Sequence, residues 1–268
     1  MRLHAVLGAV GLALALGTPA LGQTYPVATD PPRTTDPNRL RALAVEREIH
    51  ERFARGLSAE SRADWDAAIA EFTRIIVLDP AEPRGSTARY DLAIAQARSG
   101  DYHGARLGLE DALRRDPGFA AAAANLVTVD ALDGDLAAAR AAADRFVALA
   151  PASARARYER GIVALRDNDL TTARADFRAL VAGDPAYAVA HYDLAVVEIH
   201  DQHFDAAETE LETALAIDSG YARARFALGT VYVRTGRRSD ARVAFDRAAR
   251  DASDVTLRSL ALDLRDRL

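Results

Sequence analysis

The stretch Ala222–Ser253, ARARFALGTVYVRTGRRSDARVAFDRAARDAS, decides the fold of this chain. Small and apolar residues recur at helical spacing in each half of the stretch, and Gly236 interrupts the pattern between the halves. The stripe before the break is Leu228, Gly229 and Tyr232, and the stripe after it is Ala241, Phe245 and Ala248. The stretch therefore predicts two helices joined by a tight turn.

The same unit recurs through most of the chain with a fixed period. An alanine series advances in steps of 34 residues from its second member onward, and a proline and serine series runs in step with it. A constant period in this range means that one helix pair is repeated and stacked, each copy covering the apolar face of its neighbour. The alanine series is Ala68, Ala105, Ala139, Ala173, Ala207 and Ala241, and the second series is Pro80, Pro117, Pro151, Pro185, Ser219 and Ser253.

The turn inside each copy has its own chemistry. Its second position holds Gly or Asn in most copies, as in Gly100 and Asn168, which suits a left-handed cap at the end of the first helix. Asp101 and Asp169 follow directly, and an Asp there accepts hydrogen bonds from the open N–H groups of the second helix. The Asp79–Pro80 pair and its later copies stop the second helix.

With these residues the chain resembles the tetratricopeptide repeat family, whose pattern is W-x2-L-G-x2-Y, A-x3-F and P over 34 residues. The resemblance covers residues 49 to 253 as six in-phase copies. It implies an all-α, right-handed superhelical solenoid of helix-turn-helix repeats with a C-terminal capping helix. The departures are Arg52 and Arg55 in place of large apolar residues, three extra residues near Ala81 to Gly85, and the Ala-rich run Ala120 to Ala124.

Composition limits the function classes. The 268 residues include no Cys, which excludes disulfides, thiolate zinc sites and a cysteine nucleophile. All 34 basic residues are Arg, and the formal net charge of −5 without a basic cluster argues against nucleic-acid binding. No phosphate-binding loop, nucleophile elbow or zinc-protease motif is present, so we expect no enzyme and no cofactor.

The two ends of the chain read differently from the repeats. Residues 1–22 have the positive start, short apolar run and small-residue cleavage site of a signal peptide, with an uncleaved anchor as the alternative. Residues 23–37 are predicted to be a proline-rich disordered linker, and a long helix starting near Asn38 extends the first of the six repeats, residues 38–253. Residues 254–268 are expected to form a helix that caps the stack.

The family resemblance also implies a ligand surface, because the first helix of each repeat lines the concave face. Carried onto this sequence, it predicts a groove floored by aromatic and aliphatic side chains and edged by arginines. Such a groove suits a peptide with apolar and acidic groups. The predicted groove residues are Phe53, Tyr90, Arg98, Arg155, Tyr158, Ile162, Arg166, Tyr192, Val196, Arg223, Phe226 and Arg234.

Three histidines form the one local concentration of metal-ligand types: His191, His200 and His203, with Asp201 nearby. Because a zinc site needs three or four converging ligands with supporting contacts, we expect no metal here and interpret His203 as a replacement for the usual capping Asp.

Two functions fit the sequence. The favoured one is a non-enzymatic adaptor, exported to the periplasm or cell envelope of a bacterium, that holds a protein or peptide partner in the groove without a membrane span after signal cleavage. The alternative is a structural scaffold that forms homo-oligomers through an open end of the stack or through the N-terminal helix.

Overall fold

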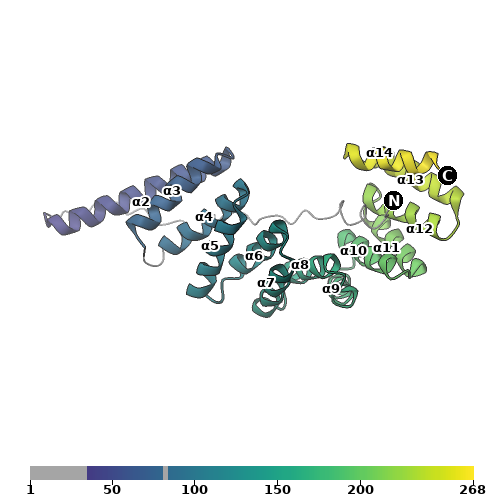
Figure 1. The fold of residues 1–268 in the computed structure, drawn as a ribbon, viewed down its shortest axis with the longest axis horizontal. Helices are drawn as coiled ribbons and strands as arrows, with labels where there is room; N and C mark the ends of the chain where they lie inside the picture. Colours follow the sequence, from purple (N-terminus) through teal and green to yellow (C-terminus); the bar gives the residue numbers. More distant parts are fainter. Residues whose placement is uncertain (1–34, 81–83) are drawn as a thin grey trace. The chain divides into compact units, whose positions relative to one another are not determined.

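The computed structural model describes residues 35–80 and 84–268, and these residues form helices and turns without a strand (Figure 1). They divide into two compact units, an N-terminal unit that ends at Leu149 and a C-terminal unit, Ala150–Leu268. The helices of the N-terminal unit are α2 (Pro37–Ser61), α3 (Trp65–Leu78), α4 (Arg84–Ser99), α5 (Tyr102–Arg115), α6 (Ala120–Asp133) and α7 (Leu136–Leu149). Those of the C-terminal unit are α8 (Ala154–Arg166), α9 (Leu170–Gly183), α10 (Ala188–His200), α11 (Phe204–Ile217), α12 (Ala222–Arg234), α13 (Arg238–Asp251) and α14 (Val255–Asp266).

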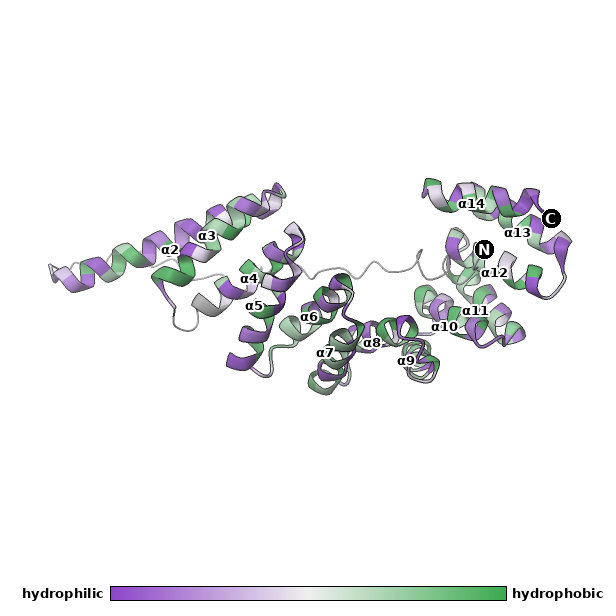
Figure 2. Ribbon diagram, in the orientation of Figure 1, coloured by the Kyte–Doolittle hydropathy of each residue, from purple (hydrophilic) through white to green (hydrophobic). Residues whose placement is uncertain are grey.

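Each unit is a stack of antiparallel helix pairs. The first helix of a pair contacts its own partner and the second helix of the preceding pair, as α10 contacts α11 and α9. Helix α12 also contacts α10, the first helix of the preceding pair. Most helices mix apolar and polar residues along their length (Figure 2). This architecture is the all-α helical-repeat solenoid that the period of 34 residues predicts, and α14 packs on α13 at the end of the C-terminal unit.

The turns lie at the predicted phase. Gly100, Gly134 and Gly236 have positive φ at the second turn position, and so does Asn168 with a φ of 61°. Ala63 and Gln202 take the same left-handed conformation although neither is a residue that favours it, with φ values of 56° and 62°. These two turns are therefore strained relative to their glycine counterparts.

The aspartates that follow the turns cap the second helices. Asp64, Asp101 and Asp169 accept hydrogen bonds from the backbone N–H groups of Ala67, Gly104 and Thr172. The predicted capping role is confirmed at these positions. His203 stands at the same position before α11 and makes no side-chain cap hydrogen bond, so it does not replace the capping Asp in this respect.

Each unit is held by close packing at small residues. The alanines of the periodic series from Ala68 to Ala241 are fully buried. The first helix of a pair also approaches its partner at a glycine: a Cβ on Gly161 would lie 2.8 Å from Phe177 Cε1, and one on Gly229 would lie 2.8 Å from Phe245 Cε1. A methyl group there would displace the buried ring, so glycine is required by packing.

Arginines on the second helices form ion pairs with the first helix of the next pair. In the C-terminal unit Arg174 Nε lies 3.0 Å from Glu198 Oε1, and Arg174 also bonds Asp201. In the N-terminal unit Arg106 Nε lies 2.7 Å from Asp130 Oδ1. Burial raises the pKa of Asp130 to about 6, with Arg106 opposing that effect.

Arg52 and Arg55, the departures from the family pattern in the first repeat, have a structural reason. Arg52 Nη1 and Arg55 Nε lie 2.9 and 3.0 Å from the two carboxylate oxygens of Glu71 on α3. These arginines join α2 to α3 by an ion pair, as Arg160 and Asp176 join α8 to α9.

The structure corrects the N-terminal boundary by one residue. Helix α2 begins at Pro37, inside the predicted linker, because Asp36 accepts a hydrogen bond from the Asn38 N–H and acts as the cap in place of Asn38. The predicted signal peptide, residues 1–22, and the linker up to residue 34 lie outside the described residues.

Candidate functional site

The predicted groove residues fall into two groups by exposure. The arginines are accessible: Arg98, Arg155, Arg166 and Arg234 are exposed and Arg223 is half-buried. The apolar members are buried except for Tyr158, which is half-buried. The buried ones are Phe53, Tyr90, Ile162, Tyr192, Val196 and Phe226.

Ring contacts explain why the aromatic row is buried. The ring of Tyr90 lies 5.0 Å from that of Phe119, and the ring of Tyr192 lies 5.2 Å from that of Tyr221. These partners stand at the end of the turn before the next repeat's first helix, so Tyr90 and Tyr192 are covered by the following repeat. The rings of Phe53 and Phe226 instead contact Phe72 and Phe245 of their own helix pairs. Their role in binding stays a prediction, and they offer a partner less surface than the sequence analysis expects.

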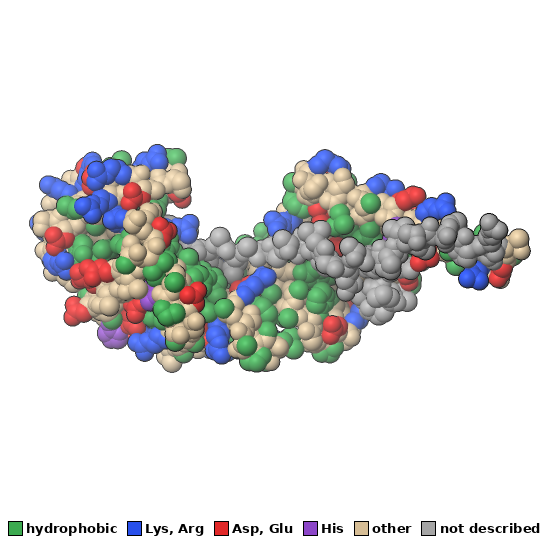
Figure 3. All heavy atoms as spheres, turned by 180° about the vertical axis from the view of Figure 1, so that it is seen from behind, with side chains coloured by type: hydrophobic (Ala, Val, Ile, Leu, Met, Phe, Trp, Pro, Cys, Tyr) green, Lys and Arg blue, Asp and Glu red, His purple; other side chains and the backbone are tan. Residues whose placement is uncertain are grey.

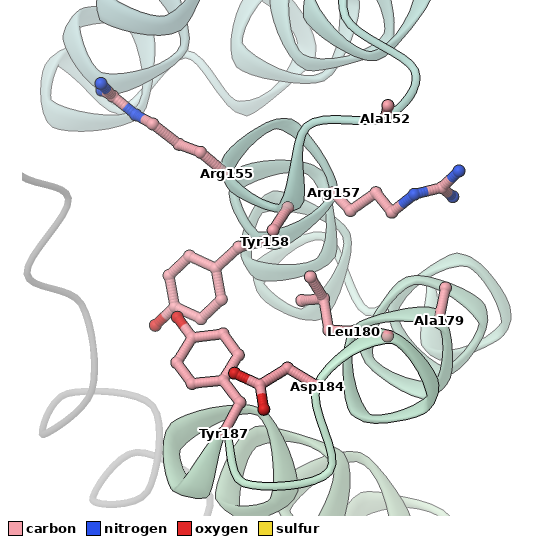
Figure 4. A pocket seen from close by; sticks show the side chains of 10 residues that line it. Ala152, Arg155, Arg157, Tyr158, Ala179, Leu180, Asp184 and Tyr187 are labelled. Carbon is pink, nitrogen blue, oxygen red and sulfur yellow. The ribbon is translucent and has the colours of Figure 1, made fainter.

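Two half-buried tyrosines of the C-terminal unit line a cavity of about 560 Å³ (Figure 4). Its walls are the start of α8, the end of α9 and the turn before α10. Tyr158 and Tyr187 point toward one another on one side of it, with ring centroids 6.3 Å apart. The lining residues are Ala152, Ala154, Arg155, Arg157, Tyr158, Ala179, Leu180, Gly183, Asp184 and Tyr187.

Asp193 on α10 is 5% exposed, and its charge acts on both of these tyrosines. The Tyr158 hydroxyl donates a hydrogen bond to its carboxylate, whereas Asp193 Oδ2 is buried without a hydrogen-bond partner. Burial raises the pKa of Asp193 to about 7, and both the Tyr158 hydrogen bond and the charge of Arg223 oppose that rise. A carboxyl group in this environment is partly neutral near neutral pH.

The sequence analysis missed Asp193, Tyr187 and Tyr221. Burial, with the Asp193 charge next, raises the pKa of both tyrosines above its usual range, so each stays a neutral hydroxyl. The aromatic residue at the position of Tyr187 and Tyr221 could have been found from the sequence, because Phe119 occupies the same repeat position. The burial of Asp193 was not, because it depends on side chains from neighbouring helices.

The arginines of this surface differ in their partners. Arg155 Nε donates to Glu159 Oε1 at 2.7 Å, and the guanidinium carbon of Arg234 lies 5.0 Å above the Phe204 ring. Within the part of the chain that the structure describes, Arg223 has neither an ion pair nor a hydrogen bond, although its charge acts on Asp193 and Tyr221. Arg223 is therefore the cation of this surface that is available to a ligand.

Comparison with known proteins agrees with this architecture. The sequence matches the tetratricopeptide repeat family over residues 53–121, 133–188 and 199–262, which is more than half of its length. The chain belongs to the tetratricopeptide repeat family. Proteins built from this repeat are generally non-catalytic interaction modules. No curated protein matches the sequence.

Solved structures of other repeat proteins share the fold. A crystal structure of MamA is 25% identical and covers 60% of this chain and 94% of its own, with a TM-score of 0.56. YrrB, described as having an unusual peptide-binding site, is 17% identical over 72% of this chain and 97% of its own, with a TM-score of 0.56. PilW, described as a type IV pilus biogenesis factor, is 21% identical over 69% and 89%, with a TM-score of 0.57.

The histidines of the C-terminal repeats are engaged by neighbouring groups. His191 Nδ1 lies 2.6 Å from Glu210 Oε2 and its Nε2 lies 3.1 Å from the Pro185 carbonyl oxygen. His203 lies with Glu198 and Asp201 in a group whose ligand atoms are within 4.8 Å of one another. Arg174 already bonds both of these carboxylates, so the geometry is that of an ion-pair network.

None of the helices within residues 35–80 and 84–268 combines the length and the apolar character needed to cross a bilayer. The charged side chains of the face drawn in Figure 3 are of both signs and interspersed, a pattern typical of solvated helix surfaces.

Proposed function

We propose that the chain is a non-enzymatic adaptor that holds a protein or peptide partner on the first-helix surface of its C-terminal unit. The observation that carries the proposal is the pair of half-buried rings, Tyr158 and Tyr187, that line the cavity, together with the unpaired Arg223, whose charge acts on Asp193 next to Tyr158. Exposed arginines and half-buried aromatic rings are the residue types that dominate binding energy in protein interfaces.

The charge of this surface selects the partner. Arg155, Arg166, Arg223 and Arg234 are accessible on the first helices, whereas the acidic groups of those helices, such as Asp193, are buried. Guanidinium groups beside tyrosine rings favour a segment with both acidic and apolar side chains. The peptide-binding site named for YrrB supports a peptide as the partner.

The place of action that we propose is the bacterial cell envelope, after export. The signal-peptide pattern of residues 1–22 supports it, as does the likeness to the pilus factor PilW. N-terminal sequencing of protein isolated from its native host should find a mature chain that begins near Gln23. Cytosolic protein that retains Met1 would contradict export.

Self-association is the second candidate, and one feature favours it. Helix α2 has 25 residues against 14 in α3, so its first part extends beyond its partner helix. Leu40 and Val45 on that part are 49% and 37% exposed. Light scattering of the full chain, with Leu40→Glu as the disrupting variant, would identify an oligomer formed through this helix.

A binding titration tests the adaptor function. A partner captured by crosslinking in envelope extracts should bind at least about tenfold more weakly to Tyr158→Ala combined with Arg223→Ala, about 1.4 kcal/mol. The matched control is Arg250→Ala, because Arg250 is 67% exposed on α13, a second helix. A thermal melt checks that each variant is folded. Unchanged affinity in the double variant would favour the scaffold.

A further inference from the structure

The Asp193 carboxyl group is a buried acid with one satisfied and one unsatisfied oxygen. Tyr158 donates across from α8, and Oδ2 has no partner. Arg223 on α12 is close enough for its charge to act on Asp193, yet the two residues form no ion pair in this structure. Burying an ionised carboxylate whose second oxygen has no partner costs folding free energy, whereas a neutral carboxyl group is compatible with the site.

Charged side chains on the other neighbouring helices form ion pairs with groups other than Asp193. On α9, Arg174 and Arg178 bond Glu198, and Asp176 bonds Arg160. On α11, Glu210 bonds His191 and Glu208 bonds Arg237. The groups that face Asp193 are therefore four tyrosines and one arginine: Tyr158, Tyr187, Tyr192, Tyr221 and Arg223.

The N-terminal unit contains an uncharged version of the same link. Asn125 Nδ2 donates to the Tyr90 hydroxyl at 2.6 Å, joining α6 to α4 as Asp193 and Tyr158 join α10 to α8. Asn125 is 1% exposed. An amide thus fits at this position of the repeat, which makes Asp193→Asn a conservative variant of the ionisable site.

We propose that Asp193 and Arg223 form a proton-linked subsite for an acidic side chain of the partner, in which ionised Asp193 competes with the ligand's carboxylate for Arg223. This inference rests on the proposed function, because it names the chemistry of one part of that binding surface. Asp193 acts through Arg223 and is a positioning residue.

The linkage follows from charge balance. When Asp193 is neutral, Arg223 is free to bond an incoming carboxylate; when Asp193 is ionised, it attracts Arg223 and leaves the ligand without its counter-ion. A bound carboxylate also repels the Asp193 charge, so binding takes up one proton at Asp193. Affinity for an acidic ligand must then fall as the pH rises through the range in which Asp193 ionises.

The probe is a short acetylated peptide of alternating Leu and Glu, with the corresponding Leu–Gln peptide as the uncharged control. From about pH 6 to about pH 8, affinity of the natural chain for the acidic peptide should fall about tenfold, as expected for one proton with a midpoint near 7. Asp193→Asn should show a change of less than about twofold over the same range. The Leu–Gln peptide should show no trend with either protein.

Two binding results would overturn the subsite: a flat pH profile in the natural chain, or the same slope in Asp193→Asn. Thermal melts of the variant exclude misfolding as the cause.

Carbon-13 NMR titration of the Asp193 carboxyl group tests the pair without any peptide. Because Arg223 favours the ionised form, Arg223→Ala should raise the midpoint of the Asp193 titration, and Arg250→Ala should not. An unchanged midpoint in Arg223→Ala overturns the subsite. If neither peptide binds at any pH but the midpoint moves as expected, the proposed partner class fails while the Asp193–Arg223 pair stands.

Discussion

The Tyr90–Asn125 link of the N-terminal unit and the Tyr158–Asp193 link of the C-terminal unit join consecutive first helices in the same way, with different chemistry. The amide carries no charge at any pH, whereas the carboxyl group ionises near neutral pH because it is buried. One position of a repeat can therefore serve as a fixed structural link in one unit and as an ionisable one in the other.

The surfaces around the two links differ as well. Ala121 and Ala124 on α6 occupy the repeat positions that Arg155 and Tyr158 occupy on α8. Helix α8 thus presents a guanidinium and a phenol group where α6 presents methyl groups. This contrast supports the proposed binding surface on the C-terminal unit.

The largest effect should come from a feature that both units share, the arginine that fastens one helix pair to the next. Arg174→Ala would leave Glu198, whose side chain is 3% exposed, without its main counter-ion. Urea unfolding should show a loss of about 3 kcal/mol, the lower end of the cost of breaking a buried ion pair, because Glu198 keeps its contacts with the more exposed Arg178 and His203. Arg106→Ala should cost a similar amount in the N-terminal unit, where Asp130 is equally buried.

Arg178→Ala is the matched control, because Arg178 also bonds Glu198 but its side chain is 63% exposed. Its loss should cost less than about 1 kcal/mol, as for exposed ion pairs. If Arg174→Ala and Arg178→Ala were equally mild, the buried ion pairs would not be what holds adjacent pairs together.

The second effect is a pH dependence of the free energy of unfolding, which the Tyr158–Asp193 link contributes and the Tyr90–Asn125 link does not. The folded-state pKa of Asp193, about 7, is above its ordinary value of 3.8, so between these values the folded chain binds the extra proton. Its free energy of unfolding should therefore fall as the pH rises from about 4 to about 7, by at most about 1.4 kcal/mol per pH unit from this group, and level off above that range.

Asp193→Asn should remove this contribution, so the variant should gain stability relative to the natural chain over the same window. Glu60, whose pKa burial also raises to about 7, and Asp130 contribute pH dependence of their own in the N-terminal unit. The difference between variant and natural chain isolates Asp193. A constant difference between pH 4 and 7 would show that Asp193 is ionised in the folded protein throughout.

The smallest effect concerns one strained turn in each unit. Ala63→Gly and Gln202→Gly relieve a left-handed backbone and should each raise stability by about 0.5–1 kcal/mol, measured as a shift in thermal midpoint. The reverse change at a relaxed turn, Gly134→Ala, should lower stability by about 1 kcal/mol. If all three variants lost stability equally, the left-handed backbone would not be what decides the stability of these turns.

The repeats and their turns could be predicted from the sequence because their determinants are local and periodic. Ala173 and its counterparts recur at fixed intervals, and Asp169 caps a helix that starts at the next residue. A helix stripe depends on neighbours three and four residues away, and a stacked repeat adds neighbours one period away, so both leave a visible pattern.

Exposure within the candidate site was decided only by the tertiary structure. Tyr158 and Tyr192 occupy one repeat position in the sequence, yet Tyr192 is covered by Tyr221 whereas Tyr158 remains partly open beside Tyr187. The burial of Asp193, and with it the shifted pKa, likewise arises from side chains of α8, α12 and the turns before α10 and α12. Period and residue type fix where a side chain stands on its helix, but the free energy of a charge or an aromatic face depends on how much water the packed neighbours leave around it.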